Sequence, residues 1–433
     1  MYDLCIIGFG VSGICCAKWA EKYNLKYIVL EKESYLGGVW FTKAMDSTSI
    51  QSPKKFYQFP DFYMPESYPI FPKKNQILNY FKNYINFSSI KNINYNCLVD
   101  SIIHVNQTYW EIKYLKKNNQ KKIKSKNIAI CSGMFCSPKN IDLKSVNSFW
   151  GRIIHSNDFK KIEKKDLNNK HITIIGNGAS CMDILKTIPN STKNINVIYR
   201  KEKWYVLDSL FGIYTYLFIN RFSLLFWTKI PSIFLLLLIS FIVKYLFASP
   251  FKTPDNIFDH TNIVMSNRYI YDLVSKNIIK FIKDEPSSLY KNYLVLKSKK
   301  IIYSDLIVLC TGYKTDLKFL KNEKTCKYNY LHILDINQKT CGYIGFTPSY
   351  NWVQVSYLQS EWFINYIIGN IKLPDNNILQ ESINIELEKK KKLNLNYNDL
   401  TYNCFEYCDN LNNQLNKKSN KFNLSYWFLN PNY

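Results

Sequence analysis

The chain has 433 residues, of which 47% are hydrophobic, so it can bury the cores of two or three domains and is neither disordered nor a small disulfide-stapled protein. Its formal charge is +24, but only four of its 57 basic residues are Arg. We interpret the Lys excess, including the loop 116–126 and the run 389–392, as solvated surface with no nucleic-acid partner. The twelve cysteines lack paired spacing and there are only five His residues, which predicts reduced thiols, an intracellular protein and no metal site.

The N-terminal segment predicts a βαβ unit that binds a dinucleotide. Residues 2–7 read as a buried strand, residues 14–23 as a helix, and residues 27–30 as a second strand that ends in Glu31. The connecting residues 8–13 have the spacing Gly-x-Gly-x-x-Gly, which lets backbone N–H groups approach a pyrophosphate at the helix N-terminus. Glu31 would accept hydrogen bonds from both ribose hydroxyls and repel a 2′-phosphate, so the pattern predicts FAD.

The predicted FAD contacts extend into the turn that follows this unit. Residues 37–40, Gly-Gly-Val-Trp, could lay their backbone against the isoalloxazine or the ribityl chain. The chain holds only 14 glycines where average usage would give about 30. Two adjacent glycines in so glycine-poor a chain therefore indicate a backbone position that no other residue fits. The residues expected to bind FAD in these two segments are Gly8, Phe9, Gly10, Ser12, Gly13, Glu31, Lys32, Gly38, Val39 and Trp40.

A second unit of this kind lies near the middle of the chain. A strand over residues 171–175, a helix over residues 182–188 and a strand over residues 195–199 accompany a second fingerprint, in which Cys181 takes the third glycine position. Where the first unit ends in an acid, this one ends in Arg200, whose guanidinium can fork onto a 2′-phosphate. The base predicts NADPH, bound by Gly176, Asn177, Gly178, Ala179, Ser180 and Arg200.

The segment between the two fingerprints carries a family resemblance. Residues 149–159 fit Phe-x-Gly-x-x-x-His-x-x-x-Phe and are followed by Lys160, as in the flavin-containing monooxygenases, which are class B flavin-dependent monooxygenases. Residues 309–313 are similar to the family's Ala-Thr-Gly-Tyr segment, and residues 358–362, Leu-Gln-x-x-Trp, to its C-terminal helix near the flavin. Residues 51–62 are most similar to the plant-type branch. The residues carried over are Phe149, Gly151, His155 and Phe159 of the motif, and Thr311, Gly312 and Gln359 near FAD.

The resemblance implies an α/β fold with two Rossmann-like dinucleotide-binding domains. Residues 1–155 would begin the FAD domain, residues 156–300 would form an inserted NADP domain, and residues 301–433 would complete the FAD domain and add a C-terminal tail. It also implies that NADPH reduces FAD, that reduced flavin captures O2 as a C4a-hydroperoxide, and that a small organic N- or S-containing nucleophile takes one oxygen atom. The flavin carries this chemistry, so no side chain is assigned a catalytic role; His155 would couple NADP binding to flavin exposure across the domain linker.

Three other functions stay open at this point. Cys131 and Cys136 form a Cys-x4-Cys pair that would suit a disulfide-reductase-like or NADPH oxidase flavoenzyme. Baeyer–Villiger oxygenation of a ketone is a second alternative, although those relatives usually carry Trp at the position of Phe159. The third is a non-catalytic flavoprotein. Several members of the resembled family also carry an active-site Asn where this chain has Ser52-Pro53, so an Asn-assisted reaction is not implied.

An apolar insert in the NADP domain, at about residues 204–250, suggests contact with a membrane. Residues 230–243 are nearly uncharged and would form a helix about 21 Å long, short of the ~30 Å hydrocarbon core. We predict a helical segment over residues 230–247 that enters one leaflet, with a buried core helix or substrate-channel cap as the alternative. The protein would then lie in the cytoplasm or on the cytoplasmic or lumenal surface of an internal membrane. The basic residues expected to meet anionic headgroups are Arg221, Lys229 and Lys244.

Overall fold

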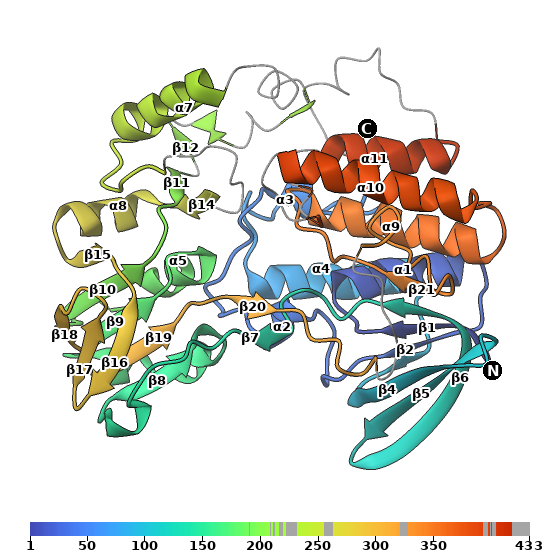
Figure 1. Cartoon of the computed structure of the whole chain (residues 1–433), viewed down its shortest axis with the longest axis horizontal. Coiled ribbons are helices and arrows are strands. Elements are labelled where there is room, and N and C mark those ends of the chain that lie inside the picture. Colours follow the sequence, from blue (N-terminus) through green and yellow to red (C-terminus); the bar gives the residue numbers. More distant parts are fainter. Residues whose placement is uncertain are drawn as a thin grey trace.

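The computed structural model shows two α/β units that lie side by side, with a layer of helices over the first unit (Figure 1). Each unit is built on its own sheet, and the first and last parts of the chain combine in one unit while the middle forms the other. The predicted fold class is confirmed. The structure describes residues 1–189, 191–207, 209–210, 213–215, 220–221, 232–254, 263–320, 328–392, 397–398, 400 and 404–417.

The first unit contains a sheet with the strand order β3-β2-β1-β6-β5-β4, in which β21 also pairs with β6. Its central strands β1, β2 and β6 are parallel, whereas β4 and β5 extend the sheet as an antiparallel meander. All of β2 and the second half of β1 are buried, as expected for apolar strands covered on both faces. The strands are β1 (Tyr2–Ile7), β2 (Tyr27–Leu30), β3 (Ile93–Asn94), β4 (Cys97–Val105), β5 (Tyr109–Lys116), β6 (Asn119–Ile130) and β21 (Cys341–Tyr343).

Helices from both ends of the chain form the layer over this sheet. The N-terminal helix α1 packs against α9, which is buried along nearly its whole length, and both contribute to the core that they share with β1 and β2. The C-terminal helices α10 and α11 complete the layer (Figure 1). The helices of this unit are α1 (Val11–Lys22), α2 (Val39–Thr42), α3 (Lys54–Tyr57), α4 (Lys74–Phe87), α9 (Trp352–Ile367), α10 (Asn376–Lys392) and α11 (Cys404–Gln414).

The second unit contains a parallel sheet with the order β15-β10-β9-β19-β8. One side of the sheet packs with α5 and α8 in a core of its own, and a three-stranded antiparallel sheet, β16 to β18, packs on the other side. The elements are β8 (Arg152–His155), β9 (His171–Ile175), α5 (Ala179–Leu185), β10 (Asn194–Tyr199), α8 (Arg268–Ser275), β15 (Ile279–Lys283), β16 (Pro286–Tyr290), β17 (Tyr293–Leu296), β18 (Ile301–Tyr303) and β19 (Leu306–Leu309).

The chain passes between the units twice, and the two passages pair with each other. The outgoing crossing, residues 132–139, contains β7 (Ser137–Pro138), and the return crossing, residues 310–314, contains β20 (Tyr313–Lys314). These two short strands form an antiparallel ribbon. The expected domain boundaries at 155/156 and 300/301 stay a prediction. Because β8 and β19 both belong to the second sheet, we propose that the chain changes from one domain to the other within the two crossings.

The apolar insert lies on the second unit and is helical in part. It contains β11 (Trp204–Leu207), the pair β12 (Ser209–Leu210) and β13 (Ile213–Tyr214), α7 (Ser232–Phe241) and a π-helical turn over Ile242–Leu246. Beyond the insert, β14 (Ile263–Ser266) pairs with β11. Val243 and Phe247 are buried and anchor the insert in the second core. Among the residues that the structure describes, no helix is long and apolar enough to cross a bilayer.

Arg221 does not face a membrane surface, so the expectation for this residue was wrong. It is 8% exposed and its Nη2 lies 3.0 Å from Oδ1 of Asp409 on α11, because a buried guanidinium requires a compensating carboxylate. Lys244 is exposed, as expected. Lys229 lies outside the described residues.

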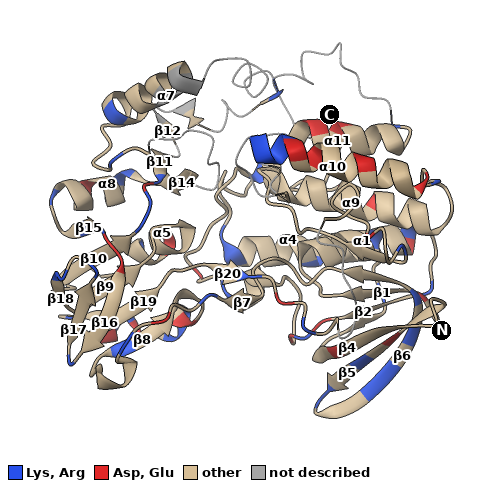
Figure 2. Cartoon of the chain, viewed as in Figure 1, with Lys and Arg blue, Asp and Glu red and all other residues tan. Residues whose placement is uncertain are grey.

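Two lysine-rich segments, the loop 116–126 and the run 389–392, differ in part from the solvated surface expected from the sequence (Figure 2). Residues 116–126 are mostly the exposed arm of the β5–β6 hairpin, so this segment is strand and not loop. Within the run 389–392, Lys390 is only 1% exposed. Its Nζ lies 3.4 Å from Oε1 of Glu386, one helical turn earlier on α10, so this lysine faces the protein with a carboxylate beside it.

Gly151 occupies a filled position just before β8. A Cβ built there would lie 2.5 Å from the ring of Phe149 and 2.6 Å from the carbonyl oxygen of Asp305. The amide of Arg152 donates to that same carbonyl at 3.0 Å, so the backbone has little freedom to move away. The Phe and the Gly of the Phe-x-Gly spacing are therefore explained by packing, because the phenyl ring of Phe149 lies directly against Gly151.

Gly151→Ala should lower the free energy of unfolding by about 1–3 kcal/mol, because an added methyl must displace the ring or the strand. Chemical denaturation followed by circular dichroism would measure the change. Trp150→Ala is the matched control, since Trp150 is 73% exposed and its truncation should change stability by no more than about 0.5 kcal/mol. Equal denaturation midpoints for Gly151→Ala and the wild type would contradict this packing.

Candidate functional site

The first fingerprint forms a cradle at the N-terminus of α1, made of residues 8–13 with Glu31 and Gly38 around them. Gly8 has φ +98°, and a Cβ there would lie 2.7 Å from the carbonyl oxygen of Cys131. A Cβ on Gly13 would lie 2.0 Å from the carbonyl oxygen of Gly8. At Gly10, by contrast, a Cβ would come no closer than 3.6 Å to any protein atom. The fold itself requires the first and third glycines, whereas a Cβ at the second would make only an ordinary van der Waals contact with Gly38. Gly10 precedes helix N–H groups that no side chain caps, which fits a pyrophosphate.

Glu31 closes one side of this cradle at the end of β2. The side chain is 4% exposed; Oε2 accepts the N–H of Phe9 at 2.5 Å and Oε1 accepts the N–H of Glu33 at 2.9 Å. Burial raises the pKa of Glu31, while the two N–H donors act against that rise. Lys32 is exposed and its Nζ lies 3.6 Å from Oε1 of Glu33. The donors fix the carboxylate next to the fingerprint, where it can accept hydroxyl groups of a ribose.

The Gly-Gly-Val-Trp turn lies against the fingerprint. Gly38 has φ +55°, and a Cβ there would lie 3.2 Å from Cα of Gly10. Trp40 is buried and its Nε1 donates to the hydroxyl of Tyr57 at 2.6 Å, while Val39 is exposed. The turn therefore presents backbone and Val39 on its open side, and Trp40 anchors it to the unit.

Gln359 lies behind the first cradle and contacts protein groups. Its Oε1 accepts the N–H of Gly345 at 2.9 Å, and its Nε2 donates to the hydroxyl of Tyr407 at 3.0 Å. Gly345 has φ +77°, and a Cβ there would overlap Oγ of Ser12. Gln359 thus holds the Gly345 backbone against the fingerprint. Sequence reasoning missed Gly345, although its survival in a glycine-poor chain was an available signal.

The second fingerprint repeats the geometry of the first in the second unit. Gly176 has φ +105°, and a Cβ there would lie 2.3 Å from the carbonyl oxygen of Cys310. Around Gly178, the N-cap of α5, there is open space within 4 Å of a built Cβ. Cys181, in the third glycine position, is fully buried in the second core, so this helix packs through a thiol. The backbone carbonyl of Asn177 accepts the hydroxyl of Tyr205 at 3.2 Å, which fixes the loop.

The rim of the second cradle carries a positive charge. Ala179 and Ser180 form the first turn of α5 and are half-buried. Arg200 directly follows β10, as Glu31 follows β2, and is exposed. Within the described residues, its guanidinium has neither an ion pair nor a hydrogen bond, so it is available to an anionic group of a ligand.

The remaining motif residues meet where the chain passes between the units. Nδ1 of His155 accepts the N–H of Asn157 at 3.1 Å, and Nε2 lies 3.1 Å from the carbonyl oxygen of Gly312. Burial lowers the pKa of His155, so the neutral ring donates through Nε2 to the return crossing. The hydroxyl of Thr311 donates to the carbonyl of Lys139 on the outgoing crossing. Phe159 is buried in the second core.

The two cysteines of the reductase alternative do not form a reactive pair. Cys131 is 5% exposed and burial raises the pKa of its thiol well above the ordinary value. The Cys136 thiol lies 2.7 Å from the carbonyl oxygen of Gly133 and 3.1 Å from that of Ser132. Both are free thiols, and the geometry favours a structural role for them.

Comparison with known proteins decides the family. A family model described as flavin-binding monooxygenase-like matches residues 2–432. The chain belongs to this family. Flavin-containing monooxygenase 1 of the dog, Canis lupus familiaris, is 26% identical over 460 residues, which cover 97% of this chain and 84% of that protein.

Solved structures share the fold of this flavin-binding monooxygenase-like chain. S-allyl-L-cysteine S-oxygenase from Allium sativum has a TM-score of 0.67 at 16% identity, and the match covers 96% of this chain and 88% of the chain of that enzyme. The OTEMO complex with FAD and NADP has a TM-score of 0.70 at 15% identity, over 90% and 89% of the two chains. Family membership confirms the predicted monooxygenase class and the predicted cofactors FAD and NADPH. Which residues hold each cofactor stays a prediction.

Gly178→Ala should weaken NADPH binding at least ~10-fold, a loss of about 1.4 kcal/mol, because the methyl would fill space that the fold leaves open for a phosphate. Unfolding stability should change by at most about 1 kcal/mol, the size of an N-cap preference. Calorimetric titration and thermal unfolding would measure the two quantities. Gly176→Ala is the contrasting control, since its Cβ meets backbone and should destabilise the protein. Unchanged NADPH affinity in Gly178→Ala would remove this loop from the site.

Proposed function

We propose that this protein is an NADPH-dependent FAD monooxygenase that transfers one oxygen atom of O2 to a small organic nucleophile containing nitrogen or sulfur. One contrast carries the proposal: two equivalent cradles end in a buried carboxylate, Glu31, and in an exposed guanidinium, Arg200. A carboxylate accepts the ribose hydroxyls of FAD, and a guanidinium pairs with the 2′-phosphate that distinguishes NADPH. The two cofactors would thus take different units of one chain.

The bound flavin supplies the redox and oxygen-transfer chemistry. The chain's own residues bind, orient and exclude water. Gly10 and Gly38 bring backbone close to the first cofactor, and Gly178 does so for the second. Neutral His155 donates to the carbonyl of Gly312 and ties the second unit to the return crossing. This contact would keep the two cradles at a fixed position relative to each other. Catalysis would rest on this placement.

The segment over residues 51–57, which lies near the first cradle, bears on which class of nucleophile the protein oxygenates. It contacts this cradle through Tyr57, which accepts from Trp40. Ser52 and Pro53 stand in this segment where several members of the resembled family carry an active-site Asn, so no asparagine is offered at that position for a polar substrate. The S-oxygenase named among the structural neighbours supports a soft sulfur centre, whose attack needs little assistance from the protein.

The visible spectrum of the purified protein during NADPH addition would test this proposal. The expected result is a bound flavin band that bleaches without air and, once air enters, returns through a transient absorbance that a sulfide or amine substrate shortens. Immediate reoxidation without a transient would indicate an oxidase or reductase instead. Cys131→Ser separates these cases, because a reductase would lose activity and the proposed monooxygenase would keep it. Absence of bound flavin would refute the proposal.

We further propose that the insert contacts a membrane surface through α7 and the turn after it. Large apolar side chains repeat at the spacing i, i+3, i+4, i+7 and i+11, which places them on one helix face. Contiguous exposed apolar surface of this kind is typical of an interaction site. Lys244 is exposed next to this face and could meet an anionic headgroup. The side chains, each more than half exposed, are Phe234, Leu237, Leu238, Phe241 and Tyr245.

Flotation with lipid vesicles would test the membrane contact. The wild type should float with vesicles that contain phosphatidylserine, and the double variant Leu237→Ser/Phe241→Ser should bind them at least ~10-fold more weakly, because two apolar side chains no longer leave water. Ile301→Ser is the control: Ile301 is 62% exposed on β18, away from the insert. Equal flotation of the double variant and the control would contradict this contact and favour a cap over the substrate channel.

A further inference from the structure

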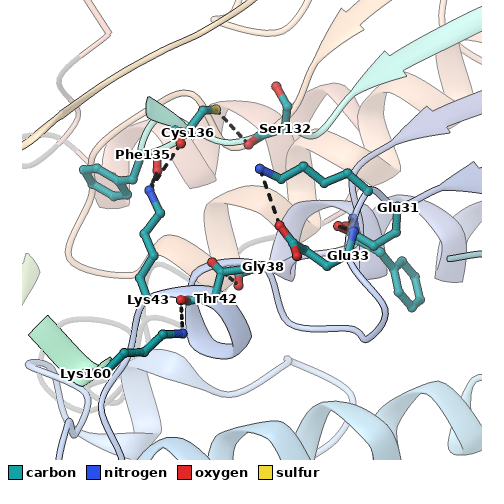
Figure 3. A network of polar contacts seen from close by, with 11 residues as sticks. Glu31, Glu33, Gly38, Thr42, Lys43, Ser132, Phe135, Cys136 and Lys160 are labelled. Atoms are coloured by element: carbon teal, nitrogen blue, oxygen red, sulfur yellow. Dashed lines mark hydrogen bonds and ion pairs between the residues drawn. The ribbon is translucent and has the colours of Figure 1, made fainter. Parts of the chain in front are cut away.

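The loop that follows the Gly-Gly-Val-Trp turn reaches the second unit. Met45 packs against the hydrophobic core of the second unit. The ammonium of Lys160, the residue after the Phe-x-Gly-x-x-x-His-x-x-x-Phe motif, donates to the carbonyl of Thr42 (Figure 3). The hydroxyl of Thr42 in turn donates to the carbonyl of Gly38 at 2.9 Å. A direct line of contacts therefore joins the predicted flavin turn to the motif of the second unit.

Lys43 extends this contact to the passages between the units. Its Nζ donates to the carbonyl oxygen of Phe135 and lies 3.4 Å from that of Cys136, both on the outgoing crossing (Figure 3). The same Nζ lies 3.7 Å from the centre of the Tyr313 ring, on the return crossing. One ammonium on the FAD side thus contacts both crossings at once, with two carbonyls and an aromatic face as its partners.

The Tyr313 ring also links Lys43 to the motif histidine. The Tyr313 and His155 rings meet edge to face with centroids 5.0 Å apart, and His155 donates to the neighbouring Gly312 carbonyl. The position of the Lys43 ammonium is therefore coupled to the tyrosine and the histidine that hold the return crossing. None of these contacts is expected from the family motifs, because Lys43 lies outside all of them.

We infer that Lys43 is a positioning residue for flavin reduction. Its ammonium holds the Gly-Gly-Val-Trp turn, predicted to contact the flavin, against both crossings and so fixes the distance and orientation between the two cradles. This inference rests on the proposed function. Loss of the charge weakens the contacts with the carbonyls and with the aromatic ring, and the cradles lose their register.

The charge on Lys43 is held only weakly. Burial lowers the pKa of Lys43 to about 8, with Lys32 adding to the shift and Cys136 opposing it. Flavin reduction by NADPH should therefore slow as the pH rises through about 8, when the ammonium loses its proton. The titratable and charged groups around Lys43 are Lys32, Cys136, Tyr313, His155 and Lys160.

Stopped-flow reduction of the bound flavin by NADPH, measured as a function of pH, tests the inference. Lys43→Met should slow reduction about 10-fold or more at neutral pH, the cost of misplaced reactants, and should remove the decrease near pH 8. Lys43→Arg should keep the neutral rate and also lose that decrease, because a guanidinium stays protonated. Reduction by dithionite and the content of bound FAD should be unchanged in both. Cys136→Ser keeps the backbone carbonyl of the contact but removes the thiol that opposes the lowering of the Lys43 pKa, so the decrease should shift to lower pH in this variant.

A second readout needs no turnover. Hydrogen exchange of the purified full-length chain should be faster in residues 132–139 and 310–314 of Lys43→Met than in the wild type, and unchanged in β4 and β5. Lys82→Met, an exposed lysine on α4, is the matched control for both measurements. The inference is overturned if Lys43→Met shows the wild-type rate and pH profile, or unchanged exchange in both crossings. If NADPH does not reduce the wild-type flavin, the proposed function fails, and exchange alone still decides whether Lys43 holds the crossings.

Discussion

The structure depends on the close approach of each glycine fingerprint to the carbonyl group that ends a neighbouring strand. In the first unit that carbonyl belongs to Cys131 and in the second to Cys310, and each lies where a Cβ on the first glycine of its fingerprint would clash with it. The amides of these cysteines also donate to the last residues of β1 and β9, both at 2.8 Å. Each crossing begins at this point of contact. The nucleotide cradle and the passage between the units are therefore one piece of backbone, and a movement of either shifts the other.

This arrangement explains why few side chains are needed at the junction. The two crossings pair as a short antiparallel ribbon, and two side chains from outside it hold it in place. His155 holds it from the second unit, Lys43 from the first, and Lys160 ties the two units directly. Since each crossing starts within a cradle, contacts that hold the ribbon also hold the two cradles, which are the predicted cofactor sites, at a set separation. A monooxygenase needs this, because NADPH must meet the flavin and water must be kept away.

Local sequence pattern was sufficient for the cradles and insufficient for the contacts between distant segments. The glycine spacing and the residue that ends each second strand located both fingerprints and distinguished Glu31 from Arg200, because a βαβ unit is determined within about 30 residues. Arg221 was assigned to a membrane surface because only its neighbours in sequence were visible, while its partner Asp409 lies 188 residues later. Lys390 was taken as solvated for the same reason. Burial of a charge depends on tertiary packing, which a run of lysines does not reveal.

The direction of the pKa shifts distinguishes the two titratable groups at the junction from ordinary stabilising contacts. Burial lowers the pKa of His155 below its unfolded value, so its contribution to stability is present above about pH 6.5 and is lost as the pH falls below that. The pKa of Lys43 is also lowered, to about 8, so the unfolded chain binds more protons between pH 8 and the ordinary lysine value. Stability should therefore rise with pH across that window, which means that the charged Lys43 costs stability at neutral pH. The half-buried ammonium nevertheless keeps two backbone carbonyls and the Tyr313 ring as partners. This is consistent with a role in placement, because placement and stability are separate demands on the same residue.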